Sequence, residues 1–227
     1  MTKNLLRRLT LATILSTPFV LSACYAQPTK QHSMMTSDFF EAIDHANLAQ
    51  VQQFLKMHPN MLEQTNAQKQ TPLMYTLYQG KQEIAAYLIE NGANVNAQDQ
   101  QLNTPFLYAG AQGDTNIVQL ALKHGARFDI FNRYNGTALI PAAEKGHVDT
   151  VRLLANTANF PIDHVNRLGW TALMEAVILS DGGKAHQEVI EILLKAGANP
   201  HIPDANGITP LQHAKQKGYI EMVKLLQ

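Results

Sequence analysis

The chain has 227 residues, of which 45% are hydrophobic and 16% are charged, and its formal net charge at pH 7 is zero. The hydrophobic content exceeds that of disordered chains and predicts a packed core, while the absence of a basic excess argues against nucleic-acid binding. The single cysteine excludes a disulfide framework and a cysteine-based zinc site.

Residues 1–23 have the composition of a secretion signal. Lys3, Arg7 and Arg8 form a basic start, and a mostly apolar stretch runs from Leu9 to Val20. At about 1.5 Å per residue, a helix of this length is too short to cross the roughly 30 Å hydrocarbon core of a bilayer. The pattern therefore predicts a cleaved signal peptide. The paired arginines leave twin-arginine export open as a less favoured route.

The segment Leu21-Ser22-Ala23-Cys24 resembles the bacterial lipobox, in which an aliphatic residue and two small residues precede a cysteine. The resemblance implies that Cys24 becomes the N-terminus and carries lipid on its sulfur, which anchors the protein in a membrane. The alternative is ordinary cleavage after Ala26. Tyr25, in place of the aspartate that retains lipoproteins at the inner membrane, implies a periplasmic protein on the outer membrane. Residues 24–36 are polar and are expected to form a tether.

The sequence from residue 37 to residue 227 is repetitive. A threonine followed by Pro or Ala and then a large apolar residue recurs every 33 to 38 residues, at Thr71, Thr104, Thr137, Thr171 and Thr209. Each threonine is placed to cap a helix, and proline suits the first helical position, where no N–H is needed. Asp38 is expected to cap the first copy in the same way. Most of these helices should end at a glycine in a left-handed conformation, at Gly80, Gly113, Gly146 and Gly218.

A second apolar helix and a polar turn follow each of these helices. The whole pattern resembles the ankyrin repeat, which implies an all-α solenoid of about six helix-turn-helix repeats with short β-hairpin fingers. The domain is expected to span residues 37–227, with repeats near 37–70, 71–103, 104–136, 137–170, 171–208 and 209–227.

Two departures from the family pattern bear on how the repeats pack. The histidine of the family's opening motif is replaced by Met74, Leu107, Ile140, Met174 and Gln212, so packing is expected to replace its polar network. The fifth repeat also carries five extra residues between its helices, around Ser180 to Lys184.

The sequence contains no catalytic, metal-binding or phosphate-binding motif of a known kind. None of the nine histidines pairs with another three or four residues away, and His124 and His147 fall at turns, where hydrogen bonding at a helix end explains them better than metal ligation. We therefore predict a protein that is not an enzyme and that uses no cofactor or metal. An enzyme or a small-ligand carrier is the alternative, and it would need a deep pocket with convergent polar groups.

Aromatic residues and two arginines are expected on the concave face formed by the finger tips and the first helices. This predicted partner-binding set is Tyr75, Tyr78, Tyr108, Arg133, Tyr134, Arg167 and Trp170. Tyr, Trp and Arg dominate the hot spots of protein interfaces. The alternative is that some of them, Tyr75 and Tyr108 above all, pack between neighbouring repeats.

We therefore predict a monomer that binds a protein partner through its concave face. By analogy with the family, two roles are open. One is to modulate a periplasmic enzyme or stress protein such as catalase, and the other is to act as an immunity protein that neutralises a delivered periplasmic toxin.

Overall fold

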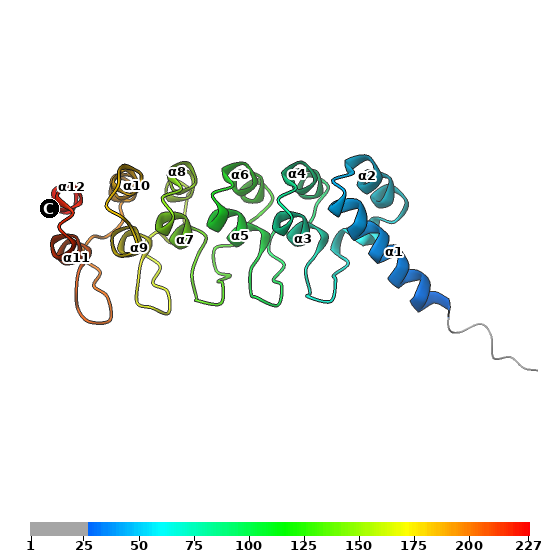
Figure 1. The fold of residues 1–227 in the computed structure, drawn as a ribbon, viewed down its shortest axis with the longest axis horizontal. Helices are drawn as coiled ribbons and strands as arrows, with labels where there is room; N and C mark the ends of the chain where they lie inside the picture. The colour runs from blue at the N-terminus through cyan, green and yellow to red at the C-terminus, as the bar shows by residue number, and fades with distance from the viewer. Residues whose placement is uncertain (1–26) are drawn as a thin grey trace, which may run out of the picture. The chain divides into compact units, whose positions relative to one another are not determined.

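The computed structural model describes residues 27–227 (Figure 1). The predicted signal peptide and Cys24 lie outside the described residues. The chain divides into two units, residues 1–35 and residues 36–227. The second unit holds the repeats.

The described residues form twelve α-helices and one 3₁₀ helix, η1. They are α1 (Gln27–Asp44), α2 (Leu48–Met57), η1 (Pro59–Glu63), α3 (Pro72–Tyr78), α4 (Gln82–Glu90), α5 (Pro105–Gln112), α6 (Thr115–Lys123), α7 (Leu139–Glu144), α8 (Val148–Ala155), α9 (Ala172–Ile178), α10 (Lys184–Lys195), α11 (Pro210–Lys217) and α12 (Ile220–Leu226). Helices α3, α5, α7, α9 and α11 form one row, and the even-numbered helices form a second row above it (Figure 1). This arrangement confirms the predicted all-α solenoid of helix pairs.

Threonine caps begin four of the first-row helices, as predicted. Thr71 Oγ1 accepts a hydrogen bond from the Met74 N–H at 3.2 Å. The same bond forms at Thr104, Thr171 and Thr209. The caps fix where each first helix starts and therefore fix the register of the repeat.

The fourth repeat does not follow this rule, so the predicted cap at Thr137 is wrong. Helix α7 begins only at Leu139, and the buried Thr137 hydroxyl has no hydrogen-bond partner. In the second repeat the Tyr75 N–H donates to the Thr71 carbonyl. The residue at the equivalent position of the fourth repeat is Pro141, which has no N–H to donate. The first turn of α7 therefore opens, and the cap geometry is lost.

The predicted cap at Asp38 is also wrong, because α1 runs through it from Gln27 to Asp44. Pro28 lies in the first helical turn, where it is tolerated, and no later residue of α1 is a glycine or a proline that would end the helix. The helix also covers residues 27–36 of the segment expected to be a tether. At its end, the buried Phe39 ring packs edge-on against Phe54 at a centroid distance of 5.6 Å.

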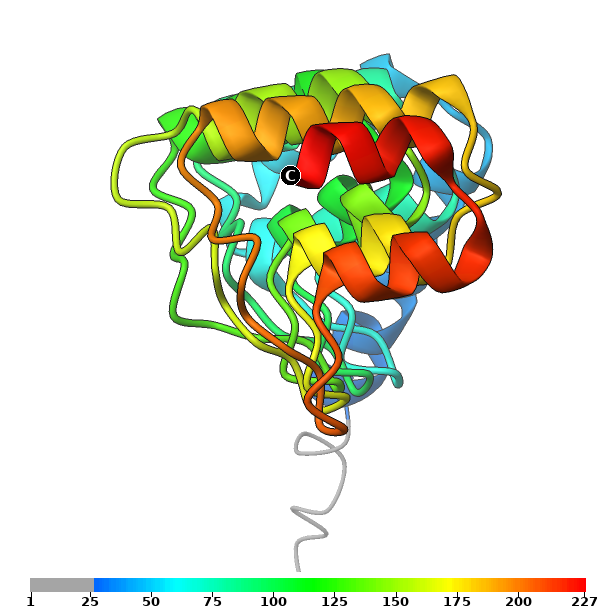
Figure 2. The same cartoon turned by 90° about the vertical axis from the view of Figure 1, so that its left-hand side faces the viewer.

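The fingers are the loops that lead from a second-row helix to the next first-row helix. They all project on one side of the stack (Figures 1 and 2). In one finger, Asn132 Oδ1 accepts hydrogen bonds from the N–H groups of Tyr134 and Gly136, both at 2.9 Å. The Asn132 N–H also donates to the Gly136 carbonyl. The same side-chain bonds recur at Asn66, Asp99, Asn166 and Asp204.

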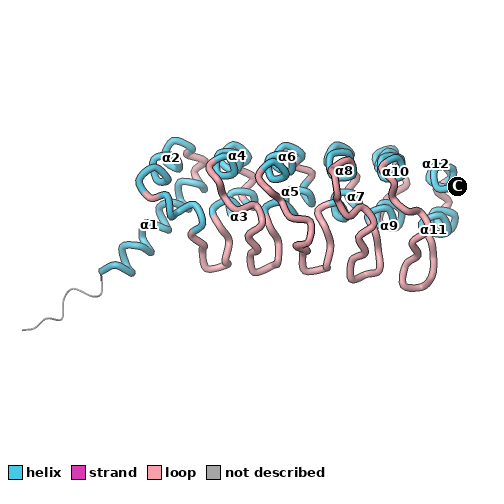
Figure 3. Tube along the Cα trace, turned by 180° about the vertical axis from the view of Figure 1, so that it is seen from behind, coloured by secondary structure: helices cyan, strands magenta, loops and turns pink. Residues whose placement is uncertain are grey.

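These fingers differ in detail from the short β-hairpins expected from the sequence. Figure 3 shows them as loops, and no described residue is in a strand. A single Asn or Asp side chain closes each turn, so a ladder of backbone bonds is not required to hold it.

Large apolar residues and one glycine hold neighbouring repeats together. Met74, Leu107, Ile140 and Met174 are buried, as expected if packing replaces the family's histidine. The expectation is wrong for Gln212, which is exposed and accepts a hydrogen bond from the Thr209 N–H at 2.8 Å. Gly110 of α5 lies so close to the next repeat that a Cβ there would come within 2.7 Å of Ala138 Cβ and 2.9 Å of the Ala138 carbonyl oxygen. The short distance between α5 and α7 therefore requires glycine, which has no side chain, at position 110.

The extra residues of the fifth repeat contact the sixth repeat, and a residue just after them contacts the fourth. The Tyr219 hydroxyl donates to the Ser180 carbonyl at 2.7 Å, and a Cβ on Gly182 would meet the Tyr219 ring at 2.7 Å. Just after the loop, His186 Nε2 lies 2.9 Å from the Glu144 carbonyl oxygen. The insertion is thus built into the stack.

Candidate protein-binding surface

Tyr75 has hydrogen-bond and ring partners inside the stack. Its hydroxyl donates to Asp44 Oδ1 at 2.6 Å, and its ring lies edge-on to Phe40 at 4.9 Å. The bond to Asp44 is the main reason that the pKa of Tyr75 rises to about 12. Tyr75 therefore joins the first repeat to the second.

Tyr78 and Tyr108 form a second pair between repeats, with ring centroids 4.6 Å apart. The Tyr78 hydroxyl donates to Asp99 Oδ2 at 2.7 Å and accepts from Asn103 Nδ2 at 3.0 Å. Burial, followed by the bond to Asp99, raises the pKa of Tyr78 to about 12. These tyrosines are half-buried, and their contacts within the chain give them a structural role whatever they bind.

The other four residues of the predicted set lie on two adjacent fingers. The Arg167 N–H donates to the Tyr134 carbonyl at 2.9 Å, and Arg167 Nη1 donates to the Arg133 carbonyl at 2.9 Å. The Arg133 guanidinium lies 5.0 Å from the centre of the Tyr134 ring. Trp170 is half-buried. The structure thus brings Arg133, Tyr134 and Arg167 together as one connected tip.

A groove of about 330 Å³ lies between these two fingers and the helices α7 and α9. Its lining comprises Asn132, Tyr134, Gly136, Ile140, Pro141, Glu144, Asn166, Leu168, Glu175 and Leu179. Three of these residues are large, apolar and about half exposed, at 52% for Tyr134, 51% for Leu168 and 47% for Leu179. Exposed apolar side chains grouped around a hollow are typical of interaction sites.

Glu175 is the most unusual group in this groove, because it is a carboxyl group that is only 5% exposed. Asn166 Nδ2 donates to its Oε1 at 2.7 Å. Burial is the main cause, and the charge of Glu144 the second, of a rise in the pKa of Glu175 to about 7. The Asn166 bond opposes this rise.

By register, Glu144 and Glu175 are expected on the concave face, but they are not in the predicted partner-binding set, and neither are Asn166 and Leu179. A signal was present in the repeat alignment, because Glu175 occupies the position that holds Tyr75 and Tyr108 in earlier repeats. An acidic residue at a position that holds tyrosine in two earlier repeats indicates a locally different surface.

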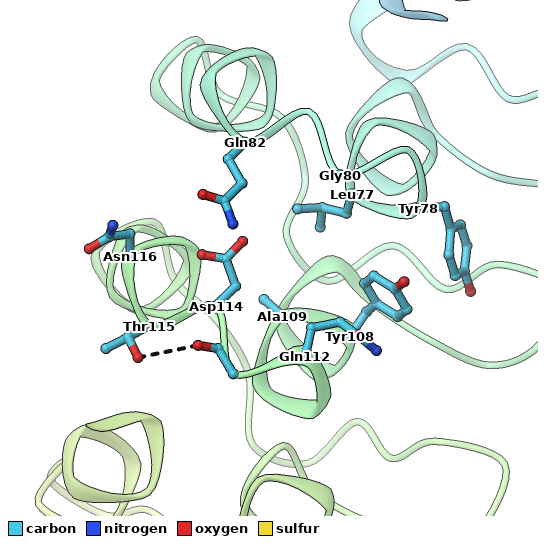
Figure 4. Close-up of a pocket in the computed structure, with 11 residues that line it drawn as sticks. Leu77, Tyr78, Gly80, Gln82, Tyr108, Ala109, Gln112, Asp114, Thr115 and Asn116 are labelled. Atoms are coloured by element: carbon cyan, nitrogen blue, oxygen red, sulfur yellow. Dashed lines mark hydrogen bonds between the residues drawn. The ribbon is translucent and has the colours of Figure 1, made fainter. Parts of the chain in front are cut away.

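A second hollow, of about 500 Å³, lies beside α3, α5 and the start of α6 (Figure 4). The Gln82 amide points toward the Asp114 carboxyl group, and Asp114 also caps α6 at the Ile117 N–H (Figure 4). Burial raises the pKa of Asp114. Asp114 is the one ionisable carboxyl group in a lining that otherwise holds amides, a threonine, two tyrosines and apolar residues, so this hollow offers no acid–base pair of carboxyl groups.

Among the described side chains of residues 27–227, no group of three or more His, Cys, Asp or Glu could hold a metal ion. Within the same range, no helix has both the length and the hydropathy needed to cross a membrane. His147, which the sequence places at a turn, packs its ring against Gly113, and its Nε2 is buried without a partner.

Comparison with known proteins identifies the family. The family model for ankyrin repeats in three copies matches residues 39–132 and 110–204. The chain belongs to the ankyrin-repeat family. Members of this family are typically protein-binding and generally not enzymes.

Solved structures and a curated relative agree with this assignment. An ankyrin repeat domain from Acinetobacter baumannii AYE is 46% identical, with a TM-score of 0.79 over 83% of this chain and 95% of that one. The ankyrin repeat protein EF0377 is 40% identical, with the same TM-score and coverage. The ankyrin repeat domain of Bcl-3, at 23% identity and a TM-score of 0.72, shows the shared fold alone.

The curated relative is a putative ankyrin repeat protein of Escherichia coli K12, YahD, which is 43% identical over 74 residues. The match spans 36% of that protein's length.

Proposed function

We propose that this ankyrin-repeat protein binds another protein through the fingers at the ends of its third and fourth repeats and the first helices of its fourth and fifth repeats. The observation that carries the proposal is the exposed Tyr134 side chain on a tip fixed by bonds to Arg167. An aromatic side chain on a backbone that is already held in place costs less conformational entropy to order on binding, so more of its burial contributes to affinity.

We further propose that the protein acts as a lipid-anchored protein of the bacterial periplasm, on the outer membrane, where it modulates an enzyme or stress protein. The support comes from the basic start of the sequence and from the segment Leu21 to Cys24. We expect Cys24→Ala to release the protein from the outer-membrane fraction or to leave its signal uncleaved. Wild-type protein found free in the cytoplasm would contradict this proposal.

The binding proposal is tested on a partner captured by crosslinking in the native cell envelope. The double change Tyr134→Ala and Trp170→Ala removes two aromatic side chains from adjacent fingers. Truncation of a buried interface aromatic costs about 2 kcal/mol or more, so the affinity measured by calorimetry should fall at least about thirtyfold.

The matched control is Met57→Ala with Ile220→Ala, which truncates two exposed apolar residues, 56% and 68% exposed, that lie on helices away from the fingers. This control should leave the affinity unchanged. Equal affinities for wild type and the finger variant would remove the fingers from the binding site. A lower melting temperature in the finger variant, with no such change in the control, would instead indicate that Trp170 packs within the stack.

A further inference from the structure

Two carboxyl groups reach the groove between α7 and α9 from neighbouring repeats. Glu144 is the last residue of α7, Glu175 lies in the first turn of α9, and both line the groove. The other lining residues are all uncharged. The groove therefore carries negative charge with no basic side chain in its own wall.

For each carboxyl group, one feature of its surroundings disfavours the charge. Glu144 lies at the C-terminal end of a helix, where the backbone carbonyl groups already make the potential negative. Lys145, the next residue, donates its ammonium group to the Ala111 carbonyl at 2.7 Å. Glu175 is buried beside Asn166, and the pKa of Glu175 is raised to about 7. A cation placed between the two groups would relieve both costs.

The apolar part of the groove complements this charge. Leu168 and Leu179 expose about half of their side chains at its rim, and Tyr134 adds a half-exposed ring. A long side chain with an aliphatic stem and a charged head would cover these residues with its stem while its head reached the carboxyl groups.

We propose that this groove receives a lysine or arginine side chain from an exposed segment of the protein partner. The charged head lies between Glu144 and Glu175, and the aliphatic stem lies on Leu168 and Leu179. This inference rests on the proposed function, since it names the chemistry by which the partner is recognised. Charge complementarity at a partly desolvated site contributes to both specificity and affinity.

The first test uses the captured partner and the full chain. Glu144→Gln with Glu175→Gln removes both charges and keeps the side-chain size and the acceptor for Asn166. The control, Glu83→Gln with Glu90→Gln, removes two charges from exposed positions of α4. The groove variant should bind at least about tenfold more weakly, and the control should stay within about twofold of wild type. An equal loss in both variants would show a general charge effect and overturn the inference.

The second test uses a defined probe, the capped peptide acetyl-Gly-Arg-Gly-amide, followed by NMR on the isotope-labelled protein. Saturable shifts are expected at the side chains of Glu144, Glu175 and Leu168. The peptide with neutral citrulline in place of arginine should cause none, and the groove variant should respond to neither peptide. Equal shifts from both peptides, or none from the arginine peptide, would overturn the inference.

The outcomes separate this inference from the proposed function. Suppose that the Tyr134 and Trp170 variant no longer binds the partner while the groove variant binds normally. The fingers then bind the partner, and the proposal that the groove receives a cationic side chain is wrong. If neither variant affects binding, both proposals fail.

Discussion

Thr137 shows how one residue can change the energetics of a repeat. Its hydroxyl is buried without a partner, whereas the Thr104 hydroxyl, one repeat earlier and equally buried, accepts a hydrogen bond from the Leu107 N–H at 3.1 Å. The difference follows from Pro141, which removes the N–H that would close the first turn of α7. The two threonines therefore form a natural matched pair.

We expect Thr137→Val to stabilise the protein by about 1 kcal/mol, because valine has the same shape and removes an unsatisfied hydroxyl. Thr104→Val should destabilise it by about 1 kcal/mol, because a helix cap is lost. Urea unfolding of the two variants beside wild type measures both changes. A loss of stability in Thr137→Val would indicate that the hydroxyl has a partner in solution.

Glu175 predicts a pH dependence of stability. Its pKa rises from an ordinary 4.5 to about 7 on folding, so between these values the folded state binds the proton more tightly than the unfolded state. The contribution of this group to stability is complete below pH 4.5 and is lost as the pH rises through 7. The full loss corresponds to about 3 kcal/mol.

Glu175→Gln should remove this dependence. We expect the variant to match wild type near pH 4.5 and to be more stable at pH 8, as measured by urea unfolding at both values. The exposed Glu83→Gln serves as the control and should show no such gain. A variant that is less stable than wild type at pH 8 would contradict the assigned cause of the pKa shift.

At the scale of the elements, spacing between helices is set by close contacts that few side chains can satisfy. Alanine in place of glycine usually stabilises a helix by about 1 kcal/mol. At Gly110 the new Cβ would lie 2.9 Å from a backbone oxygen of Ala138, which cannot swing away. We expect overpacking to win, so that Gly110→Ala destabilises the protein by about 1–3 kcal/mol.

Gln112→Ala, at an exposed position of the same helix, is the control for this change. It should be neutral or slightly stabilising in the same urea unfolding experiment. If Gly110→Ala were also stabilising, the distance between α5 and α7 would have to be larger than in the structure.

At the scale of the whole molecule, each repeat of the unit 36–227 packs on its neighbours along the stack (Figure 1). The stability of such an array is a sum of local and nearest-neighbour terms. A change in the middle should therefore affect adjacent repeats first. Leu139, which is fully buried at the start of α7, is suited to test this.

Leu139→Ala should cost about 2–5 kcal/mol, as for other buried leucines. Hydrogen exchange should show faster exchange of the amides in α5, α7, α8 and α9, with a smaller change in α3 and α4. A uniform rise across all helices would show that the stack unfolds as one unit rather than repeat by repeat.

The sequence by itself determined the repeat, its period and the starts of four of the first-row helices. A threonine cap or a glycine at a helix end acts over three or four residues. The local sequence therefore predicts these helix ends, unless a nearby residue such as proline changes the backbone. The same local logic failed at Asp38, because no residue stops α1 upstream of it, and at Thr137, because Pro141 lies four residues further on.

Only the tertiary structure decided what the surface of the repeats contains. Tyr75 and Tyr78 lie on first helices, as the alignment predicts, but their hydroxyl groups are bonded to Asp44 and Asp99. Glu144 and Glu175 are 31 residues apart in the chain and share one groove because α7 packs on α9. The burial of a side chain and the distance between two charges depend on this packing. The period of the sequence therefore predicts which residues are neighbours, but it does not predict which of their side chains are buried, which pack between repeats and which remain exposed.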